Sequence, residues 1–161
     1  MKILGIDPGH SRIGYGIIST RSDITLIDAG VIEITSKEMS KKLFELARRL
    51  SILVKKHRPD LLALETLFFS KNKTTALRVA EARGVILLIA AQNNIAVREL
   101  NPMSVKKIIG GHGTSDKASL ARFIERLLNT KLPKGPDDIS DAVAIALAGA
   151  LSFPLDPHTK C

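Results

Sequence analysis

Four acidic side chains stand where apolar segments of the chain begin or end. Asp7 and Glu65 each close a short apolar run, and Asp138 and Asp141 lie three residues apart at the start of a long one. A carboxylate at the end of a buried strand needs a partner, because its desolvation otherwise costs several kcal/mol. Residues three apart on a helix share one face, with Cβ atoms roughly 5–6 Å apart. The four acids are therefore candidates for one shared site.

Carboxylates gathered in one site repel one another unless a cation lies between them. Hard divalent cations take oxygen ligands, and Mg²⁺ binds through one or two carboxylates together with waters and substrate phosphates. Two such ions can activate a water and stabilise the leaving oxygen of a phosphodiester. Each acid alone also has a plainer interpretation: Asp7 or Glu65 as a turn residue, and Asp138 with Asp141 as a charge pair that complements the helix dipole. Asp137 is interpreted as a helix cap rather than as a ligand.

The elements that must position these acids follow from the spacing of apolar residues. β-branched segments separated by short polar turns predict an antiparallel meander of three strands, and helical spacing begins after them. The expected strands cover residues 3–6, 13–19, 24–34, 60–65 and 95–100, and the expected helices cover 39–57, 74–93, 116–128 and segments that begin at 102 and near 137. Pro59 ends the first helix, and Ser115 is the expected N-cap of the fourth. If the strands that end in Asp7 and Glu65 are parallel neighbours, both acids emerge at one sheet edge.

The composition fits a single α/β domain, which we expect to span residues 1–152 and to be followed by a short tail at 153–161. Lys and Arg total 24 against 16 Asp and Glu, a net charge of +8. This charge favours nucleic-acid binding and equally fits a solvated surface. Cys161 is the only cysteine, and the longest apolar run is far shorter than the roughly 20 residues of a membrane span. We therefore expect a cytoplasmic protein that does not enter a membrane.

Four stretches of the chain form a joint pattern: LGIDPG with the downstream GYG, then LALETLFFSKN, then ALRVAEARGV, then DDISDAVAIA. Their order and spacing resemble the RuvC family of Holliday junction resolvases over nearly the whole chain. The resemblance implies a ribonuclease H-like α/β fold, with a mixed five-stranded sheet (an antiparallel meander plus parallel strands) flanked by helices. It also implies that Asp7, Glu65, Asp138 and Asp141 are the catalytic residues and metal ligands, the same four that the apolar pattern groups.

The resemblance further implies a substrate, a cofactor and partners. Family members act as homodimers and use Mg²⁺ or Mn²⁺ to nick two strands symmetrically across a four-way DNA junction in recombination and repair. We therefore expect two Mg²⁺ ions per active site, with Mn²⁺ as a substitute, and a RuvA–RuvB branch-migration complex as partner. A two-fold dimer suits this reaction, because two symmetric nicks require two active sites related by symmetry.

Further positions take expected roles in DNA binding from the same resemblance. An aromatic side chain near the junction centre can stack on an unpaired base, and lysines can contact phosphates. The expected DNA contacts are Phe68, Phe69, Lys71, Lys106 and Lys117. Core packing is an equal alternative for Phe69, and a plain solvated face is an equal alternative for Lys71, Lys73 and Arg78.

A stripe of small residues, Ala76, Ala80 and Gly84, recurs every four positions and permits close approach of another element. The resemblance places this stripe at the dimer interface, and burial against the chain's own sheet is the alternative. His10 and His112 lie in glycine-bearing loops near the proposed site and are interpreted as incidental rather than as proton-transfer groups.

Three other functions compete with a junction resolvase. Actin-like kinases also open with a strand followed by Asp and Gly, but the chain lacks their second phosphate loop and their length. A non-catalytic nucleic-acid binder would explain the positive charge and leave four converging acids as an electrostatic penalty on DNA binding. A nuclease acting on ordinary duplex or on RNA–DNA hybrid would have the same metal chemistry and is the nearest alternative.

Overall fold

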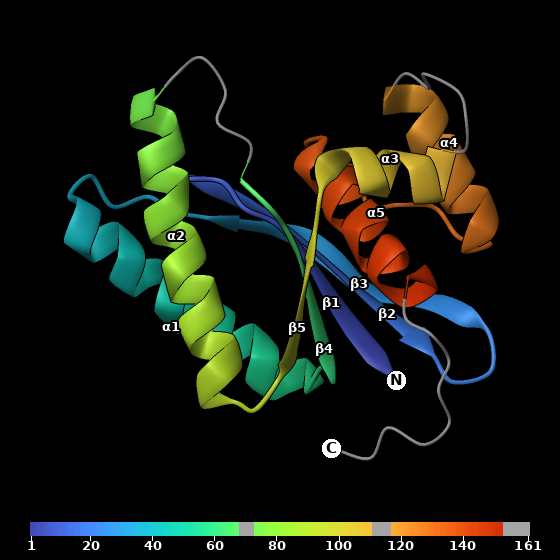
Figure 1. The fold of residues 1–161 in the computed structure, drawn as a ribbon, viewed down its shortest axis with the longest axis horizontal. Coiled ribbons are helices and arrows are strands. Elements are labelled where there is room, and N and C mark those ends of the chain that lie inside the picture. The colour runs from blue at the N-terminus through green and yellow to red at the C-terminus, as the bar shows by residue number, and fades with distance from the viewer. Residues whose placement is uncertain (68–72, 111–116, 153–161) are drawn as a thin grey trace.

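The computed structural model describes residues 1–67, 73–110 and 117–152, in which one five-stranded sheet lies between two layers of helices (Figure 1). The strands are β1 (Lys2–Asp7), β2 (Arg12–Thr20), β3 (Ile24–Glu33), β4 (Leu61–Glu65) and β5 (Ala96–Leu100). The helices are α1 (Met39–His57), α2 (Lys73–Gln92), α3 (Pro102–Gly110), α4 (Lys117–Leu127) and α5 (Asp138–Leu151). The boundaries expected from the sequence lie within one residue of these.

The sheet has the strand order β3-β2-β1-β4-β5. β1, β2 and β3 form an antiparallel meander, and β4 and β5 continue the sheet in parallel to β1. The mixed five-stranded fold is therefore confirmed, and β1 and β4 are parallel neighbours, which is the condition under which Asp7 and Glu65 emerge at one sheet edge. Parallel strands of this kind need a crossover, which α1 provides between β3 and β4 and α2 provides between β4 and β5.

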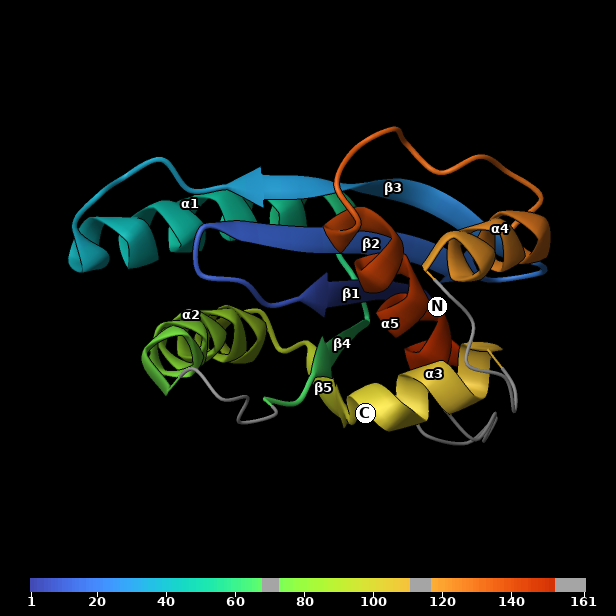
Figure 2. The ribbon, with the colours of Figure 1, turned by 90° about the horizontal axis from the view of Figure 1, so that it is seen from above.

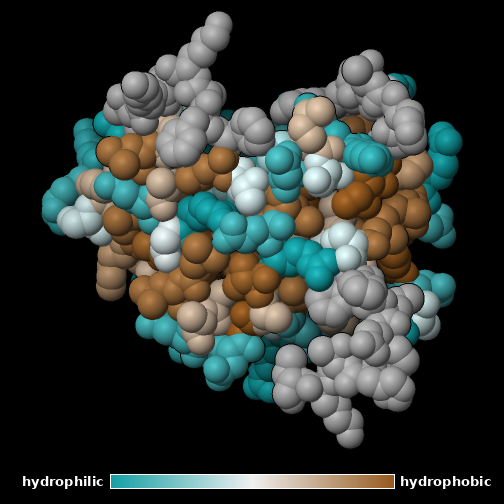
Figure 3. Space-filling view, viewed as in Figure 1, coloured by the Kyte–Doolittle hydropathy of each residue, from teal (hydrophilic) through white to brown (hydrophobic). Residues whose placement is uncertain are grey.

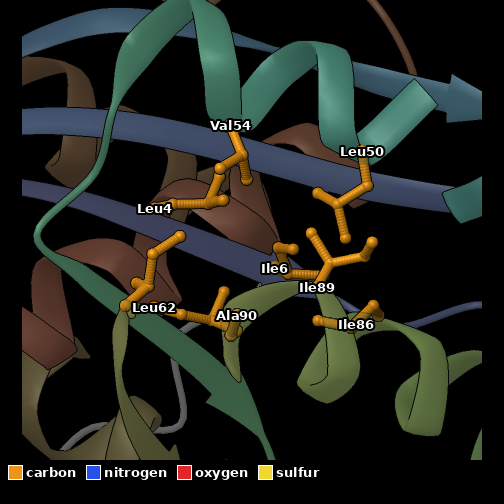
Figure 4. A pocket seen from close by; sticks show the side chains of 9 residues that line it. Leu4, Ile6, Leu50, Val54, Leu62, Ile86, Ile89 and Ala90 are labelled. Carbon is orange, nitrogen blue, oxygen red and sulfur yellow. The ribbon is translucent and has the colours of Figure 1, made fainter. Parts of the chain in front are cut away.

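α1 and α2 cover one face of the sheet and form an aliphatic core with it (Figure 2). α1 contributes Leu50 and Val54 to this core, and α2 contributes Ile86 and Ile89. The core encloses a gap of about 10 Å³ that is lined only by aliphatic side chains (Figure 4). A space of this size and polarity has no room for a substrate and no polar group for a bound water. The functional site must lie elsewhere.

α5 crosses the opposite face and lies directly on the backbone of β1 and β2 (Figure 2). A Cβ atom at Gly5 would collide with the backbone of Ala142 and Ala146, and one at Gly16 would collide with Val143. These glycines are needed because a side chain would hold the helix away from the strands. The residues of α5 from Ala142 to Gly149 are consequently all buried. The glycines on either side of Tyr15 in the GYG motif therefore lie in the surface of the sheet on which α5 packs.

Helix ends are closed by local contacts. α1 ends where Arg58 turns into the left-handed region at φ 49°, and its N–H donates to the carbonyl of Val54 at 2.7 Å. α3 begins at Pro102, and the side-chain oxygen of Asn101 accepts from the N–H of Met103 at 2.8 Å. Within the described ranges, no helix is long and apolar enough to cross a membrane.

Candidate active site

The register of the parallel strands brings Asp7 and Glu65 to the same edge of the sheet. β1 and β4 pair up to Ile6 and Leu64, so the two acids are the next residues of adjacent strands. Side chains alternate between the faces of a sheet, and Ala63, two residues before Glu65, packs in the core on the α5 side. The Glu65 carboxylate therefore faces α5.

α5 begins at this edge and supplies the other two acids. Gly14 of β2 pairs with Asp7, and a Cβ atom at Gly14 would collide with the carbonyl of Asp138 and lie 3.2 Å from its Cβ. The missing side chain at Gly14 therefore allows the first turn of α5 to approach Asp7. Asp138 and Asp141 both belong to this first turn, where the helix dipole favours negative charge.

Asp137 occupies the N-cap position of α5, as the sequence predicts, but its side chain does not make the hydrogen bond expected of a cap. Its backbone is already helical at φ −58° and ψ −25°, whereas an N-cap residue is normally extended, and its side chain makes no capping hydrogen bond. The Ile139 N–H in the first turn donates to the carbonyl of Pro136 at 3.1 Å instead. The Asp137 carbonyl accepts from the N–H of Asp141 at 3.0 Å and from the hydroxyl of Ser140 at 2.9 Å.

The electrostatics of Glu65 identify its neighbours. Burial raises the pKa of Glu65 above its ordinary value, and the nearby Asp141 carboxylate raises this pKa further. Lys106 of α3 acts in the opposite direction, because its ammonium group favours the ionised carboxylate. Glu65, Asp141 and Lys106 therefore share one electrostatic environment. A half-buried carboxylate that another carboxylate repels is stabilised when a cation binds between them.

Arg12 is a neighbour of the site that the sequence did not indicate. It opens β2, and its guanidinium lies 3.6 Å from the Asp138 carboxylate, with 57% of its side chain exposed. Arg12 follows a turn whose sequence resembles an ordinary polar loop, so no local pattern distinguishes it. A clue existed only in the register, because Arg12 lies two residues before the Gly14 that pairs with Asp7.

The donor chemistry of the site fits a hard divalent cation. All four predicted ligands are carboxylates, they lie on β1, β4 and the first turn of α5, and at least Glu65 and Asp141 repel each other. Among the described residues, no three His, Cys, Asp or Glu side chains stand close enough to hold a metal ion as they are arranged. Asp138 has a cationic neighbour in Arg12, whose guanidinium lies 3.6 Å from the carboxylate.

The structure locates only part of the predicted DNA surface. Lys106 is exposed on α3 near Glu65, and Lys117 is the first residue of α4, where its side chain is not described. His10 is exposed in the turn after β1, and Arg78 is exposed on α2. The predictions that lie outside the described residues are Phe68, Phe69, Lys71, His112 and Ser115, and the side chain of Lys73 is likewise not described.

The small-residue stripe of α2 turns gradually from the core to the surface. Ala76 is buried, Ala80 is half-buried, and Gly84 is exposed with nothing within 4 Å of the position of a Cβ atom. Leu77 and Leu88 flank the stripe and are 65% and 55% exposed. Hydrophobic residues are visible on this outward surface of α2 (Figure 3). We name the four exposed or half-exposed residues Leu77, Ala80, Gly84 and Leu88 the α2 outer face.

A mixed five-stranded sheet with an antiparallel meander, parallel strands and a helix across its centre defines a ribonuclease H-like fold. A family model described as "Crossover junction endodeoxyribonuclease RuvC" matches residues 3–149. A relative of that name from Caldicellulosiruptor saccharolyticus is 43% identical over 156 residues, which cover 94% of this chain and 93% of the relative. Another from Thermosipho melanesiensis is 45% identical over 150 residues, covering 91% and 94%. The chain belongs to the RuvC family.

Solved structures agree with this assignment. The structure of Thermus thermophilus RuvC in complex with a Holliday junction substrate superposes with a TM-score of 0.83 at 26% identity, covering 94% of each chain. The yeast mitochondrial Holliday junction resolvase Ydc2 superposes with a TM-score of 0.70 at 15% identity, covering 91% of this chain and 76% of Ydc2, and it shares the fold.

Proposed function

We propose that this protein is an endonuclease that resolves four-way DNA junctions by hydrolysing phosphodiester bonds. The observation that supports this best is the position of Asp7 and Glu65 beside the first turn of α5, in a chain of the RuvC family. The relatives named above are crossover junction endodeoxyribonucleases, and the T. thermophilus structure holds a Holliday junction substrate. A nuclease of ordinary duplex would use the same acids, so the choice of a junction rests on the family.

Asp7, Glu65, Asp138 and Asp141 are the proposed metal ligands and catalytic residues. Two Mg²⁺ ions, or Mn²⁺ in their place, would supply an activated water and stabilise the charge on the leaving oxygen. The protein's part is to hold the ligands at fixed positions. β1 and β4 fix two carboxylates through the sheet, and α5 fixes two through its contact with Gly14.

Basic residues around the acids are the proposed phosphate contacts. Lys106 favours the ionised form of Glu65 and is exposed, so it can also reach a phosphate near the scissile bond. Arg12 is placed at the opposite side of the site, beside Asp138. Lys71 and Lys117 remain proposed contacts from the family pattern, and Phe68 and Phe69 remain the proposed aromatics at the junction centre.

We also propose that the protein acts as a homodimer through the α2 outer face. An exposed stripe of two leucines, an alanine and a glycine on one helix suits close packing against the same helix of a second copy. A RuvA–RuvB complex as the source of the junction and a cytoplasmic location, where the DNA lies, complete this proposal.

The decisive experiment compares cleavage of a mobile four-way junction with cleavage of linear duplex of the same sequence. Each substrate is incubated with Mg²⁺, with a chelator, and with the variant Asp7→Asn. We expect paired symmetric nicks on the junction only, lost with the chelator and in the variant, while junction binding by the variant is retained. Asp23→Asn, in the turn between β2 and β3 and away from the site, is the matched control and should cleave normally.

Two other outcomes would change the conclusion. Binding of the junction without nicking under all conditions would contradict a nuclease and favour a binding protein. Equal cleavage of duplex and junction would preserve the metal chemistry and reject the proposed substrate.

A further inference from the structure

Arg83 is a buried cation on α2 that the proposed chemistry does not use. Only 8% of the residue is exposed. A buried guanidinium is stable only when its hydrogen bonds are satisfied, and a well-packed apolar residue would often be at least as stabilising in its place. The contacts that Arg83 makes are therefore informative about why an arginine stands there.

Arg83 joins α2 to the ends of two strands. One guanidinium nitrogen donates to the carbonyl of Glu65 at 2.9 Å. The second terminal nitrogen, Nη2, lies 2.6 Å from the carboxylate of Glu99 on β5. Glu99 pairs with Leu64 in the ladder between β4 and β5, so the arginine bridges neighbouring strands at the edge where the acids emerge. The planar fork of arginine can make both contacts at once, whereas a lysine ammonium is a single point charge.

The position of this bridge matters because of where Glu65 lies in its strand. Glu65 is the last residue of β4, and the ladder between β1 and β4 is registered only as far as Ile6 and Leu64. Pro8 follows on the β1 side, and proline has no N–H to donate. Arg83 thus supplies a donor to the Glu65 carbonyl where the regular ladder runs out.

Arg83 lies on the face of the sheet opposite to the one that the Glu65 carboxylate faces. The Glu65 carboxylate faces α5, and the arginine reaches the backbone of Glu65 from α2, which packs on the other face. A peptide whose carbonyl is held by a hydrogen bond cannot rotate freely, so this bond fixes the direction in which the Cβ of Glu65 leaves the strand, without any contact to the carboxylate itself. Misplacement of a metal ligand by about 1 Å can cost on the order of 10²-fold in rate.

We propose that Arg83 is a positioning residue for Glu65, and that it sets the direction in which this carboxylate meets a divalent cation. The inference rests on the proposed function, because it takes Glu65 as a metal ligand. It adds a link between α2, which carries the proposed dimer surface, and the active site on the far face of the sheet. Gly84 of the α2 outer face is the next residue after Arg83.

The test uses Arg83→Met, which keeps the apolar stem and donates nothing, and Arg83→Lys, which keeps the charge. Glu99→Gln removes the ion pair and leaves the hydrogen bond to Glu65. Arg48→Met is the matched control, because Arg48 is exposed on α1 on the same side of the sheet. Each full-length variant is measured for junction cleavage over a range of Mg²⁺ concentrations, for junction binding in chelator, for molecular mass in solution, and for the rise of Tm caused by Mg²⁺ without DNA.

For Arg83→Met we expect cleavage to fall by about tenfold or more and the half-saturating Mg²⁺ concentration to rise several-fold. Junction binding in chelator and molecular mass should stay at wild-type values. The cleavage rate and the half-saturating Mg²⁺ concentration of Arg83→Lys should lie between those of wild type and Arg83→Met. Glu99→Gln should lose less cleavage activity than Arg83→Met. A folded Arg83→Met with an unchanged rate and unchanged Mg²⁺ dependence would overturn the proposal. So would equal loss of cleavage, binding in chelator and dimer mass, since that pattern belongs to a merely structural residue.

Two further results keep the inference separate from folding and from the proposed function. If Arg83→Met does not fold, Arg83→Lys and Glu99→Gln decide the matter by the same Mg²⁺ dependence. If the wild-type protein cuts no junction, the proposed function fails on its own. The effect of Mg²⁺ on the Tm of wild type and Arg83→Lys then still tests the positioning of Glu65: a smaller rise in the variant supports it, and an equal rise overturns it.

Discussion

α5 and α2 are both helices packed on the sheet, from opposite faces, and they differ in whether the glycines at their surfaces already have a neighbour. Under α5 the glycines make close contacts with the sheet: Gly5 and Gly16 of the strands leave the space that the helix backbone fills, and Gly149 of the helix itself lies against Ala63. In α2 the glycine belongs to the helix, and Gly84 faces outward with nothing near it. The close approach that glycine permits is thus already made by α5, and on α2 it is still open to another molecule.

The two helices also divide the work of the site. α5 brings Asp138 and Asp141 into it directly, while the contact that the described part of α2 makes with it is the hydrogen bond from Arg83 to the Glu65 carbonyl, on the other face of the sheet. We infer that changes under α5 should act on fold and chemistry together. Changes on the outward side of α2 should act on assembly and leave the fold of one subunit intact.

The largest effect expected from this comparison is the loss of an acid on α5. Asp141→Asn keeps the shape of the side chain and removes a proposed metal ligand, so cleavage should fall by on the order of 10³-fold. Asp137→Asn changes an acid one turn earlier that is not part of the site, and it should cleave within about threefold of wild type. Steady-state nicking of a labelled junction measures both. Equal losses of cleavage in the two variants would mean that cleavage depends on the net charge at the start of α5 and not on Asp141 as a metal ligand.

A smaller effect is expected from filling the space under α5. In Gly16→Ala the new Cβ would lie 2.7 Å from a methyl carbon of Val143 and 2.9 Å from its Cα. Overpacking of this kind costs typically about 1–3 kcal/mol of unfolding free energy. Val143→Ala removes the methyl clash and leaves the backbone clash, so the double variant should be more stable than the sum of the single effects predicts. Urea unfolding of the four proteins measures the coupling, and strict additivity would contradict direct contact.

On α2 the expected effect is on association. Leu88→Glu places a charge on the α2 outer face, where the leucine is 55% exposed in one subunit. We expect the dissociation constant of the dimer to rise by about tenfold or more, equivalent to about 1.4 kcal/mol, with the unfolding of the single subunit unchanged. Sedimentation velocity over a concentration series measures this. Phe44→Glu is the control, because Phe44 is 72% exposed on α1 and lies outside this face.

The result for Leu88 would also decide between the two interpretations of the small-residue stripe. A dimer that survives Leu88→Glu but not Phe44→Glu would move the interface from α2 to α1. A protein that is monomeric at all concentrations would leave the stripe as a surface of the single chain.

The sequence predicted the backbone of this fold and site well, and side-chain contacts across the sheet poorly. Apolar periodicity located α1 to the residue and placed Asp7 and Glu65 at strand ends, and the structure supplies the parallel pairing of those strands. These features depend on local pattern. The contact of Arg12 with Asp138 and the bridge of Arg83 join residues far apart in the chain, and each partner is unremarkable in its own segment. Asp137 is at the expected N-cap position without the expected side-chain hydrogen bond, because the Ile139 N–H of the first turn donates to the Pro136 carbonyl, and sequence does not distinguish a carbonyl acceptor from a side-chain one.

The buried Glu45 and the half-buried Glu65 lie on different sides of the sheet, and their pKa values are shifted in opposite directions. Glu45 of α1 accepts hydrogen bonds from the backbone and hydroxyl of Ser36, and these, with help from Arg49 and Thr35, lower its pKa to about 2. Glu65 lies in the opposite condition, because burial and Asp141 raise its pKa. The ionised form of the first carboxylate is stabilised by hydrogen bonds, whereas that of the second is disfavoured by burial and by Asp141, an effect that Lys106 offsets only in part.

The smallest expected effects follow from these opposite shifts. Because the folded pKa of Glu45 lies below its ordinary value of 4.5, its stabilising contribution is present above pH 4.5 and is lost as the pH falls toward 2. The folded pKa of Glu65 is raised, so its contribution favours the folded state below the ordinary value and is lost as the pH rises through the folded pKa. In metal-free protein at neutral pH, Glu45→Gln should therefore lower Tm slightly, and Glu65→Gln should raise it. Thermal unfolding in chelator from pH 3 to pH 8 measures both. A drop in Tm for Glu65→Gln at neutral pH would show that the carboxylate is already satisfied within the protein, and it would remove the electrostatic argument for a cation at this edge of the sheet.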